Sequence, residues 1–375
     1  MKILLIIDHF GSGGAQRQIV QLARGLIERG HTVEMFVYFP RFDFFRGELA
    51  LHQVHVHEYA KEDIGSPRLV MSLARVLRDG KFDAAISFQG TANIYAELGR
   101  LGARSTRLIV SERTNFQDDR SAFGAIARRL LHLLADRVIA NSETQAAWLK
   151  GRPWLESRVS CIYNGVDLDR FRPASPPRTS SEMRILGIGR IGPEKNLRNL
   201  MRGLQLFADK SGSIPQVHWA GERDSSPAGQ QCCQELDRLL AQFQAVSRQW
   251  RWLGLQGEIS ALLPQYDALV HPSLYEGSPN AICEALACGV PVLASNVCDH
   301  PRLVHDGERG FLFDPKSPAS IADALHKMLV LTPEERCSFS RNARQYAETH
   351  LGTDTMVEAY EQLCAGLLRR SAGAE

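Results

Sequence analysis

The sequence has little of what would place it in several large classes of protein. Its 375 residues include eight cysteines, but no two are spaced as C-x-x-C, so neither a zinc site nor a disulfide framework is indicated. No apolar run approaches the length of a membrane span. The run at residues 3–7 is too short for a signal peptide and is followed at once by Asp8. We therefore expect a cytoplasmic protein whose cysteines are reduced.

An excess of charge of one sign is also missing. Lysine and arginine number 44 and the acidic residues 42, so the formal net charge of +2 gives no reason to expect a nucleic-acid partner. With 44% hydrophobic and 23% charged residues the composition is that of a globular protein. This length is more natural for two α/β domains than for one.

Two common nucleotide-binding signatures are incomplete. Gly11 and Gly13 fit the start of G-x-G-x-x-G, but Gln16 holds the third glycine position and no acidic residue ends the next strand, which disfavours NAD. The Gly-Lys-Ser/Thr of a P-loop is absent as well. The loop that includes Gly11, Gly13 and Gly14 is thus either a phosphate-binding loop or only a tight turn between a strand and a helix.

The first half of the chain alternates short apolar runs with amphipathic stretches, a pattern that predicts a parallel sheet with helices on both faces. One helix follows the glycine loop and ends at Gly30, and another covers residues 67–79 between caps at Ser66 and Gly80. The expected strands are residues 2–8, 32–39, 54–59, 82–88, 107–112 and 137–140.

The second half repeats this pattern and then becomes helical. We expect strands at residues 183–189, 217–220, 250–253, 268–271 and 291–294, a helix at 196–209, and helices at 318–330, 333–349 and 354–369. The predicted domains are 1–170, a Pro/Ser-rich linker at 171–182, 183–352, and a last helix at 353–375 that packs back on the first domain. Two doubly wound sheets that face each other would bind ligands at the carboxyl ends of their strands.

The most informative stretch is residues 271–295, which contains two carboxylates around a predicted helix start. Ser278 as N-cap and Pro279 in the first turn leave Glu276 in the loop and Glu284 on the helix. A helix N-terminus suits an anion, whereas carboxylates suit sugar hydroxyls, and a nucleotide sugar has both. Two alternatives are the acid/base pair of a glycoside hydrolase and, for Glu284 alone, a surface acid.

A second loop places two cations beside a helix start. Arg190 and Lys195 follow the first strand of the second half, where they could neutralise a diphosphate as it leaves. The alternative is a pair of solvated loop cations.

These segments together resemble glycosyltransferase family 4. Glu276 and Glu284 look like the family's paired glutamates, in a setting of Pro-Ser, Glu-Gly, Pro-Asn, Glu-Ala and Gly-Val-Pro-Val. Four more segments agree in order, and the resemblance covers essentially the whole chain: residues 13–17, 164–167, 189–196, and 219–221 with 253–254.

The resemblance implies the GT-B fold and metal-independent transfer from a UDP- or GDP-linked sugar, with retention of configuration and no further cofactor. Arg190 and Lys195 would bind the diphosphate, Glu284 the ribose and Glu276 the donor sugar. Gly14 would present its N–H near the phosphate or the reacting centre, and the leaving phosphate would help to deprotonate the acceptor. The other positions expected to line the substrate site are Gly13, Asn164, Gly189, Gly221, Gly277, Ser278, Pro279, Asn280 and Ala281.

One departure from the family concerns a histidine that many members place after a later strand of the first domain. Here Glu112 and Arg113 occupy that position and are the candidate replacements. Lone histidines such as His9 and His271 are more often structural than catalytic.

His55 and His57 share one face of a strand. Because no third ligand is evident near them in the sequence, an exposed strand face explains them better than a metal site.

The acceptor is expected to be a glycan or a polyprenyl- or lipid-linked glycan. Residues 122–134 combine leucines with arginines, either as a basic amphipathic helix on an anionic inner membrane face or as an ordinary helix with a solvated basic side. The interpretation is a retaining transferase of a hexose or N-acetylhexosamine in the biosynthesis of cell-surface polysaccharides. Its rivals are a nucleotide-sugar epimerase and a non-catalytic nucleotide-sugar-binding protein.

Overall fold

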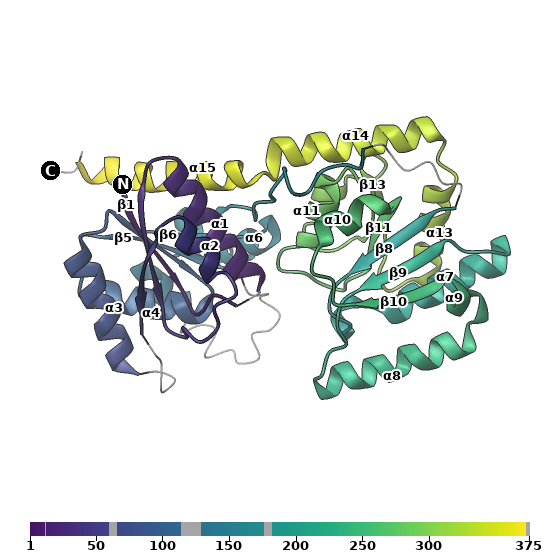
Figure 1. Ribbon diagram of the computed structural model, residues 1–375, viewed down its shortest axis with the longest axis horizontal. Helices are drawn as coiled ribbons and strands as arrows, with labels where there is room; N and C mark the ends of the chain where they lie inside the picture. The colour runs from purple at the N-terminus through teal and green to yellow at the C-terminus, as the bar shows by residue number, and fades with distance from the viewer. Residues whose placement is uncertain (12, 60–65, 114–128, 176–181, 373–375) are drawn as a thin grey trace. The chain divides into compact units, whose positions relative to one another are not determined.

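The computed structural model describes residues 1–11, 13–59, 66–113, 129–175 and 182–372 (Figure 1). The chain forms two compact units, Met1–Gly165 together with Thr353–Glu375, and Val166–Gly352. The first division therefore falls between Gly165 and Val166, before the linker expected at residues 171–182. The reason is burial, because Val166 and Phe171 lie in the core of the second unit.

The sheet of the first unit has seven strands in the order β3-β2-β1-β4-β5-β6-β7, and every paired neighbour is parallel. Its strands are β1 (Lys2–Ile7), β2 (Thr32–Val37), β3 (His55–Glu58), β4 (Ala84–Phe88), β5 (Arg107–Glu112), β6 (Arg137–Ala140) and β7 (Val159–Cys161). Because successive side chains of a strand point to opposite faces, this sheet divides the unit into two cores.

Alternate residues of β1 pack into the two different cores. Ile3, Leu5 and Ile7 pack with α1 and α15, whereas Leu4 and Ile6 pack with α3, α4 and α6. A strand that is buried on both faces explains the continuous apolar run in the sequence. The helices are α1 (Gly14–Glu28), α2 (Arg46–Leu51), α3 (Pro67–Gly80), α4 (Gly90–Arg100), η2 (His132–Leu134), α6 (Glu143–Lys150), η3 (Glu156–Arg158) and α15 (Thr353–Ala372).

The second unit repeats this plan with a six-stranded parallel sheet in the order β10-β9-β8-β11-β12-β13. Its strands are β8 (Arg184–Ile188), β9 (Gln216–Ala220), β10 (Trp250–Gly254), β11 (Ala268–His271), β12 (Val292–Ser295) and β13 (Gly310–Phe313). Ile185 faces a core with α7, α8 and α13, and Leu186 faces a core with α11 and α14. The predicted fold class, two doubly wound sheets with a helical tail, is confirmed.

Helices cover both faces of this second sheet (Figure 1). They are η4 (Pro193–Lys195), α7 (Leu197–Ser211), α8 (Pro227–Gln242), α9 (Gln244–Gln249), α10 (Ile259–Leu262), η5 (Leu263–Gln265), α11 (Asn280–Ala287), α12 (His300–Val304), α13 (Pro318–Leu329) and α14 (Pro333–His350).

The structure corrects several details of the prediction. The edge strands β7, of three residues, and β13, of four, had not been predicted. Gly80 is the last residue of α3 rather than its cap, and Lys81 takes the left-handed conformation instead. Ser66 stands at the N-cap of α3 but makes no side-chain capping bond.

The last helix, α15, belongs to the first unit and lies along α1 (Figure 1). Val357 and Tyr360 are fully buried in the same core as β1 and α1. Arg29 and His31, just beyond α1, both pair with Glu361 of α15 at 3.1 Å and 2.8 Å. Among the described helices, none is both long enough and apolar enough to cross a bilayer.

A glycine sets the distance between α1 and α15, which gives a packing test. A Cβ built on Gly25 would lie 2.5 Å from Cγ2 of Val357. We expect Gly25→Ala to lower the free energy of unfolding by about 1–3 kcal/mol through overpacking. Val357→Ala in the same chain should recover part of that loss in urea unfolding, because it removes the clashing methyl groups.

Gly366→Ala on α15 is the matched control, because a Cβ there meets nothing within 4 Å. It should be neutral or slightly stabilising, since alanine is the better helix former. Additive effects of Gly25→Ala and Val357→Ala would contradict the direct contact.

Candidate functional site

The two motifs expected to bind the donor follow neighbouring strands of the second sheet. Gly189 and Arg190 come directly after β8, and Glu276 lies in the loop after β11. Strands β8 and β11 pair in parallel, so their carboxyl ends meet at one edge. Two segments far apart in the sequence are thereby brought together.

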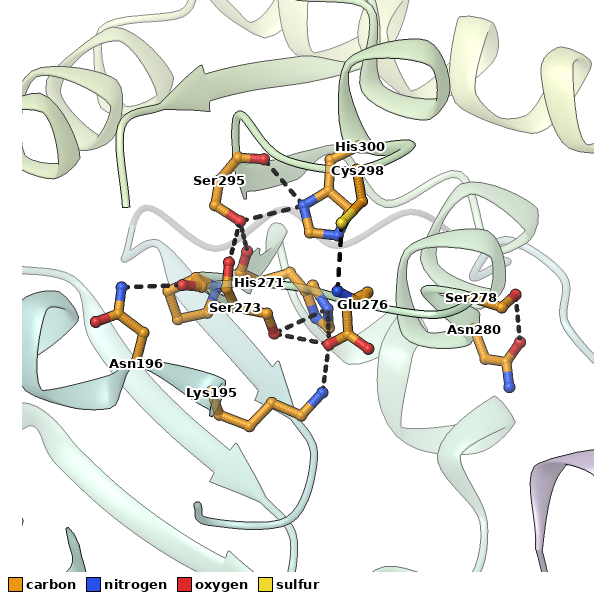
Figure 2. A network of polar contacts seen from close by, with 11 residues as sticks. Lys195, Asn196, His271, Ser273, Glu276, Ser278, Asn280, Ser295, Cys298 and His300 are labelled. Atoms are coloured by element: carbon orange, nitrogen blue, oxygen red, sulfur yellow. Dashed lines mark hydrogen bonds and ion pairs between the residues drawn. The ribbon is translucent and has the colours of Figure 1, made fainter. Parts of the chain in front are cut away.

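An ion pair joins these two loops. The Lys195 Nζ lies 2.5 Å from Oε1 of Glu276, and each side chain is only 15% exposed (Figure 2). A charge that is largely removed from water needs such a partner, because neither group alone would recover its lost hydration. The pair therefore holds the cationic loop against the acidic one.

Two further groups donate to the same carboxylate oxygen. His271 Nε2 lies 2.9 Å and Ser273 Oγ 2.7 Å from Oε1 of Glu276 (Figure 2). Burial raises the pKa of Glu276, but the hydrogen bonds from His271 and Lys195 and the charge of Lys195 outweigh it, so that its pKa lies well below the usual range. Glu276 is thus an anion at neutral pH.

Two buried histidines stand behind this carboxylate, their rings 5.2 Å apart. Burial is the largest cause that lowers the pKa of both His271 and His300, the latter to about 3. His300 Nδ1 lies 2.9 Å from the carbonyl oxygen of Ser295, to which it donates (Figure 2). Both rings are therefore neutral, and His271 serves Glu276 as a hydrogen-bond donor.

Two glycines make room at this edge of the sheet. Gly189 has φ +146°, and a Cβ on it would lie 2.9 Å from Cε of Lys195. A Cβ on Gly221 would lie 1.9 Å from the carbonyl oxygen of Gly189, which is nearer than any real contact. Only glycine lets the backbone and the Lys195 stem approach this closely.

Arg190 is held loosely. Its side chain is 63% exposed, with Glu194 at 3.7 Å and Asp224 at 4.0 Å. Exposed pairs of this kind contribute little free energy, so the guanidinium can turn to an incoming anion at small cost.

Helix α11 begins later than expected. Pro279 occupies its N-cap position without a side-chain hydrogen bond, and the helix runs from Asn280. Ser278 is therefore not the cap, since its hydroxyl lies 3.4 Å from Oδ1 of the Asn280 side chain (Figure 2). Glu284 lies one turn along α11 from Asn280, on the same face and half-buried. Gly277 and Ala281, beside this helix start, are also partly exposed.

The chemistry of Glu276 argues against a glycoside hydrolase. A general acid for glycoside hydrolysis needs a raised pKa so that it holds a proton at working pH. Glu276 has a lowered pKa and is already engaged by Lys195 and His271. The arrangement suits binding.

In the first unit, α1 begins at Gly14 with Gly13 as its extended N-cap. A Cβ on Gly13 would lie 2.2 Å from Oε1 of Gln16, so a side chain there would displace the end of the Gln16 side chain. The nearby His9 is structural, since its Nδ1 accepts from the Gly11 N–H at 2.9 Å.

Arg113 is committed to the interior of the first unit. Its guanidinium donates to Ser111 Oγ at 3.1 Å and to Asn164 Oδ1 at 2.5 Å, and lies 3.6 Å from the centre of the Phe88 ring. A third nitrogen is 3.4 Å from the Tyr360 hydroxyl on α15. These contacts link Arg113 to Asn164 and to α15 within the first unit.

Glu112 ends a buried polar chain that had not been predicted. His132 lies between two carboxylates, 2.6 Å from Glu97 and 3.5 Å from Glu112, and Asn93 donates to Glu112 at 2.9 Å. Burial raises the pKa of Glu97. The sequence signal that could have revealed this network is Glu97, an acidic residue in the interior of a helix. The same argument was applied to Glu284. We infer that this network fixes the orientation of the Glu112 carboxylate.

The basic stretch at residues 122–134 lies largely outside the described residues. Of its described end, Arg129 stacks 4.1 Å from the centre of the Trp148 ring, and Leu130 is exposed.

Two α/β units, each built on a parallel sheet, define the GT-B fold. One similar solved structure is that of the HepE protein of Anabaena in complex with UDP. Its TM-score is 0.81, with 19% identity over 98% of this chain and 100% of that one. A glycosyltransferase of Rickettsia africae has a TM-score of 0.83 and 16% identity over 98% of each chain.

Two family models match consecutive parts of the chain, "Glycosyltransferase Family 4" at residues 12–170 and "Glycosyl transferases group 1" at 170–346. The protein belongs to the family 4-like glycosyltransferases, which confirms the resemblance.

Its curated relatives include D-inositol 3-phosphate glycosyltransferases. The enzyme of Corynebacterium jeikeium is 30% identical over 246 residues, which cover 61% of this chain. The enzyme of Geodermatophilus obscurus is 27% identical over 408 residues, which cover 96% of this chain and 88% of the relative. The chain spans 58%, 57% and 50% of the first three relatives it matches.

The buried His300 predicts acid sensitivity. Its pKa is lowered to about 3, whereas an unfolded histidine titrates near 6.5, so the unfolded chain binds more protons between these values. Stability should therefore fall as pH drops below about 6.5, by at most about 1.4 kcal/mol per pH unit for one group. His300→Asn, which can keep the hydrogen bond to Ser295, should lose less stability between about pH 6.5 and pH 5 in urea titrations.

His305→Asn is the control, because His305 is 62% exposed. Parallel pH curves for the wild type and His300→Asn would show that His300 does not carry this dependence.

Proposed function

We propose that the protein is a retaining glycosyltransferase that moves a hexose or N-acetylhexosamine from a nucleoside-diphosphate sugar to a glycan or lipid-linked acceptor. The ion pair between Lys195 and Glu276 is the observation that carries the proposal. It places a cation that could bind a diphosphate and a carboxylate that could bind a sugar at the same edge of one sheet. Open α/β sheets bind their ligands at this edge. A nucleotide sugar presents both complementary groups within a single molecule.

The diphosphate is assigned to Arg190 and Lys195. Arg190 is exposed and weakly held, and Lys195 lies beside Gly189, where the absence of a side chain lets an anion approach the backbone. As the bond from sugar to phosphate breaks, negative charge grows on the leaving diphosphate, and the charges of Arg190 and Lys195 would stabilise it. In this proposal transfer is metal-independent.

The sugar and the ribose are assigned to the segment around α11. Glu276 is held as an anion whose Oε1 is already engaged, so a sugar hydroxyl would donate to Oε2. Glu284 would accept from the ribose hydroxyls, and Gly277 to Ala281 would supply the backbone around the sugar. We propose UDP before GDP, because the HepE structures contain UDP and UDP-glucose.

The acceptor is assigned to the first unit. At the carboxyl edge of its sheet, the Gly14 N–H would lie near the phosphate or the reacting centre, and the oriented carboxylate of Glu112 would replace the family's histidine. In the proposed reaction the leaving phosphate takes the acceptor proton on the same face of the sugar. A role at the inner membrane face in cell-surface polysaccharide synthesis would fit a lipid-linked acceptor.

Arg190→Ala tests the assignment of the leaving group. We expect the rate of transfer to fall by roughly 10²–10³-fold, as for other donors to a developing anion, with little change in stability because the side chain is exposed. The measurement is release of UDP from UDP-sugars in the presence of glycan and lipid-linked acceptors.

Arg198→Ala is the matched control, an exposed arginine near the start of α7 whose partner is Glu235. Turnover near the wild-type rate in Arg190→Ala would remove Arg190 from the mechanism. Lys195→Ala is a poorer test, since it also leaves Glu276 without its cation.

Glu284→Ala tests the ribose assignment. We expect the affinity for bare UDP to fall by roughly tenfold or more, because a hydrogen bond to a charged group is worth about 1.5–3 kcal/mol. Calorimetric titration with UDP and GDP measures this and also identifies the preferred base.

Equal UDP affinity in the wild type and in Glu284→Ala would contradict the assignment. Conversion of the donor without an acceptor would favour an epimerase, and binding without turnover over the acceptor panel would favour a non-catalytic binding protein.

A further inference from the structure

Three side chains of ligand type lie together in the first unit. Glu34 comes from β2, and His55 and His57 come from the edge strand β3. In the parallel register Glu34 is opposite His55 and Phe36 is opposite His57. Alternate residues share a face, so Glu34, His55 and His57 project from the same face of the sheet.

The contacts show that these groups already converge. His57 Nε2 lies 2.7 Å from Oε2 of Glu34, and the rings of His55 and His57 are 4.4 Å apart. One ligand atom from each residue lies within 4.8 Å of the others. Glu34 is not evident as a third ligand from the sequence, because it is remote from the histidine pair and is brought alongside only by strand pairing.

The charges fit a divalent ion. One oxygen of the Glu34 carboxylate, Oε2, faces His57. Lys2 Nζ lies 2.8 Å from Oε1, the other oxygen. A cation between Oε2 and the imidazoles would therefore replace the proton that Glu34 and His57 share, and Lys2 could remain in place.

The donor set also indicates which ion. Two imidazoles and one carboxylate form a set that binds Zn²⁺ and leaves a fourth position for water. Imidazole nitrogen suits Zn²⁺, Ni²⁺ and Cu²⁺, whereas Mg²⁺ prefers oxygen ligands alone.

We propose that Glu34, His55 and His57 form a binding site for a divalent transition-metal ion, with Zn²⁺ as its reference ligand. The ion would bridge β3 to β2 and so fasten the edge strand of the sheet. Because it binds the folded protein, it raises the stability of the first unit as its concentration increases.

The test uses the full chain without a polyhistidine tag, titrated with ZnCl₂ in a calorimeter. We expect one equivalent per chain at about pH 7.5, and weaker binding at lower pH, because protons compete with a metal ion for its ligands. His55→Ala, His57→Ala and Glu34→Gln should each weaken binding by roughly tenfold or more, as loss of a direct ligand does. Zn²⁺ should raise the melting temperature, and Mg²⁺ should not.

Two controls separate this site from other groups that bind metals. His305→Asn removes an exposed histidine elsewhere, and Cys337→Ser removes an exposed thiol, so both should bind Zn²⁺ as the wild type does. His55 is exposed, so His55→Ala decides the question even if the other two variants fail to fold. Unchanged Zn²⁺ binding in folded His55→Ala, or its loss in Cys337→Ser, would overturn the proposal.

Discussion

A lysine and a glutamate from separate loops neutralise each other at the carboxyl edge of the second sheet, and the surrounding arrangement depends on that pairing. The missing side chain at Gly189 makes room for the stem of Lys195, which pairs with Glu276. The carboxylate stays an anion because Lys195, His271 and Ser273 all donate to one oxygen. Compensation of buried charge therefore fixes the positions of both loops before any ligand arrives.

The first unit satisfies the same requirement by other means. Its buried carboxylates, Glu97 and Glu112, share one histidine instead of a lysine, and Arg113 is balanced by neutral oxygens and the face of an aromatic ring. In each unit apolar side chains on both faces of the sheet supply the packing, while polar groups gather near the carboxyl ends of strands. The chain thus repeats one architecture with two different sets of polar groups.

Much of this was predictable from local pattern. The runs that became β1 and β8 are buried on both faces, so apolar periodicity identified them. Edge strand β7 has only three residues, and two of the four residues of edge strand β13 are only partly buried, so their apolar signal is weaker. Contacts such as Glu97 with His132, or Glu34 with His57, depend on which strands and helices become neighbours, and residue spacing does not encode that. The predicted N-cap of α11 was wrong because Pro279, and not Ser278, occupies that position.

The assignment of α15 to the first unit has a consequence for biosynthesis. The second unit, Val166–Gly352, is one uninterrupted segment, whereas the first unit needs residues from both ends of the chain. During translation the middle of the protein can therefore complete its core first. Until Val357 and Tyr360 have left the ribosome, one face of the N-terminal sheet remains incompletely covered. Exposure of that apolar face to chaperones, or to another nascent chain, lasts as long as synthesis of the intervening residues.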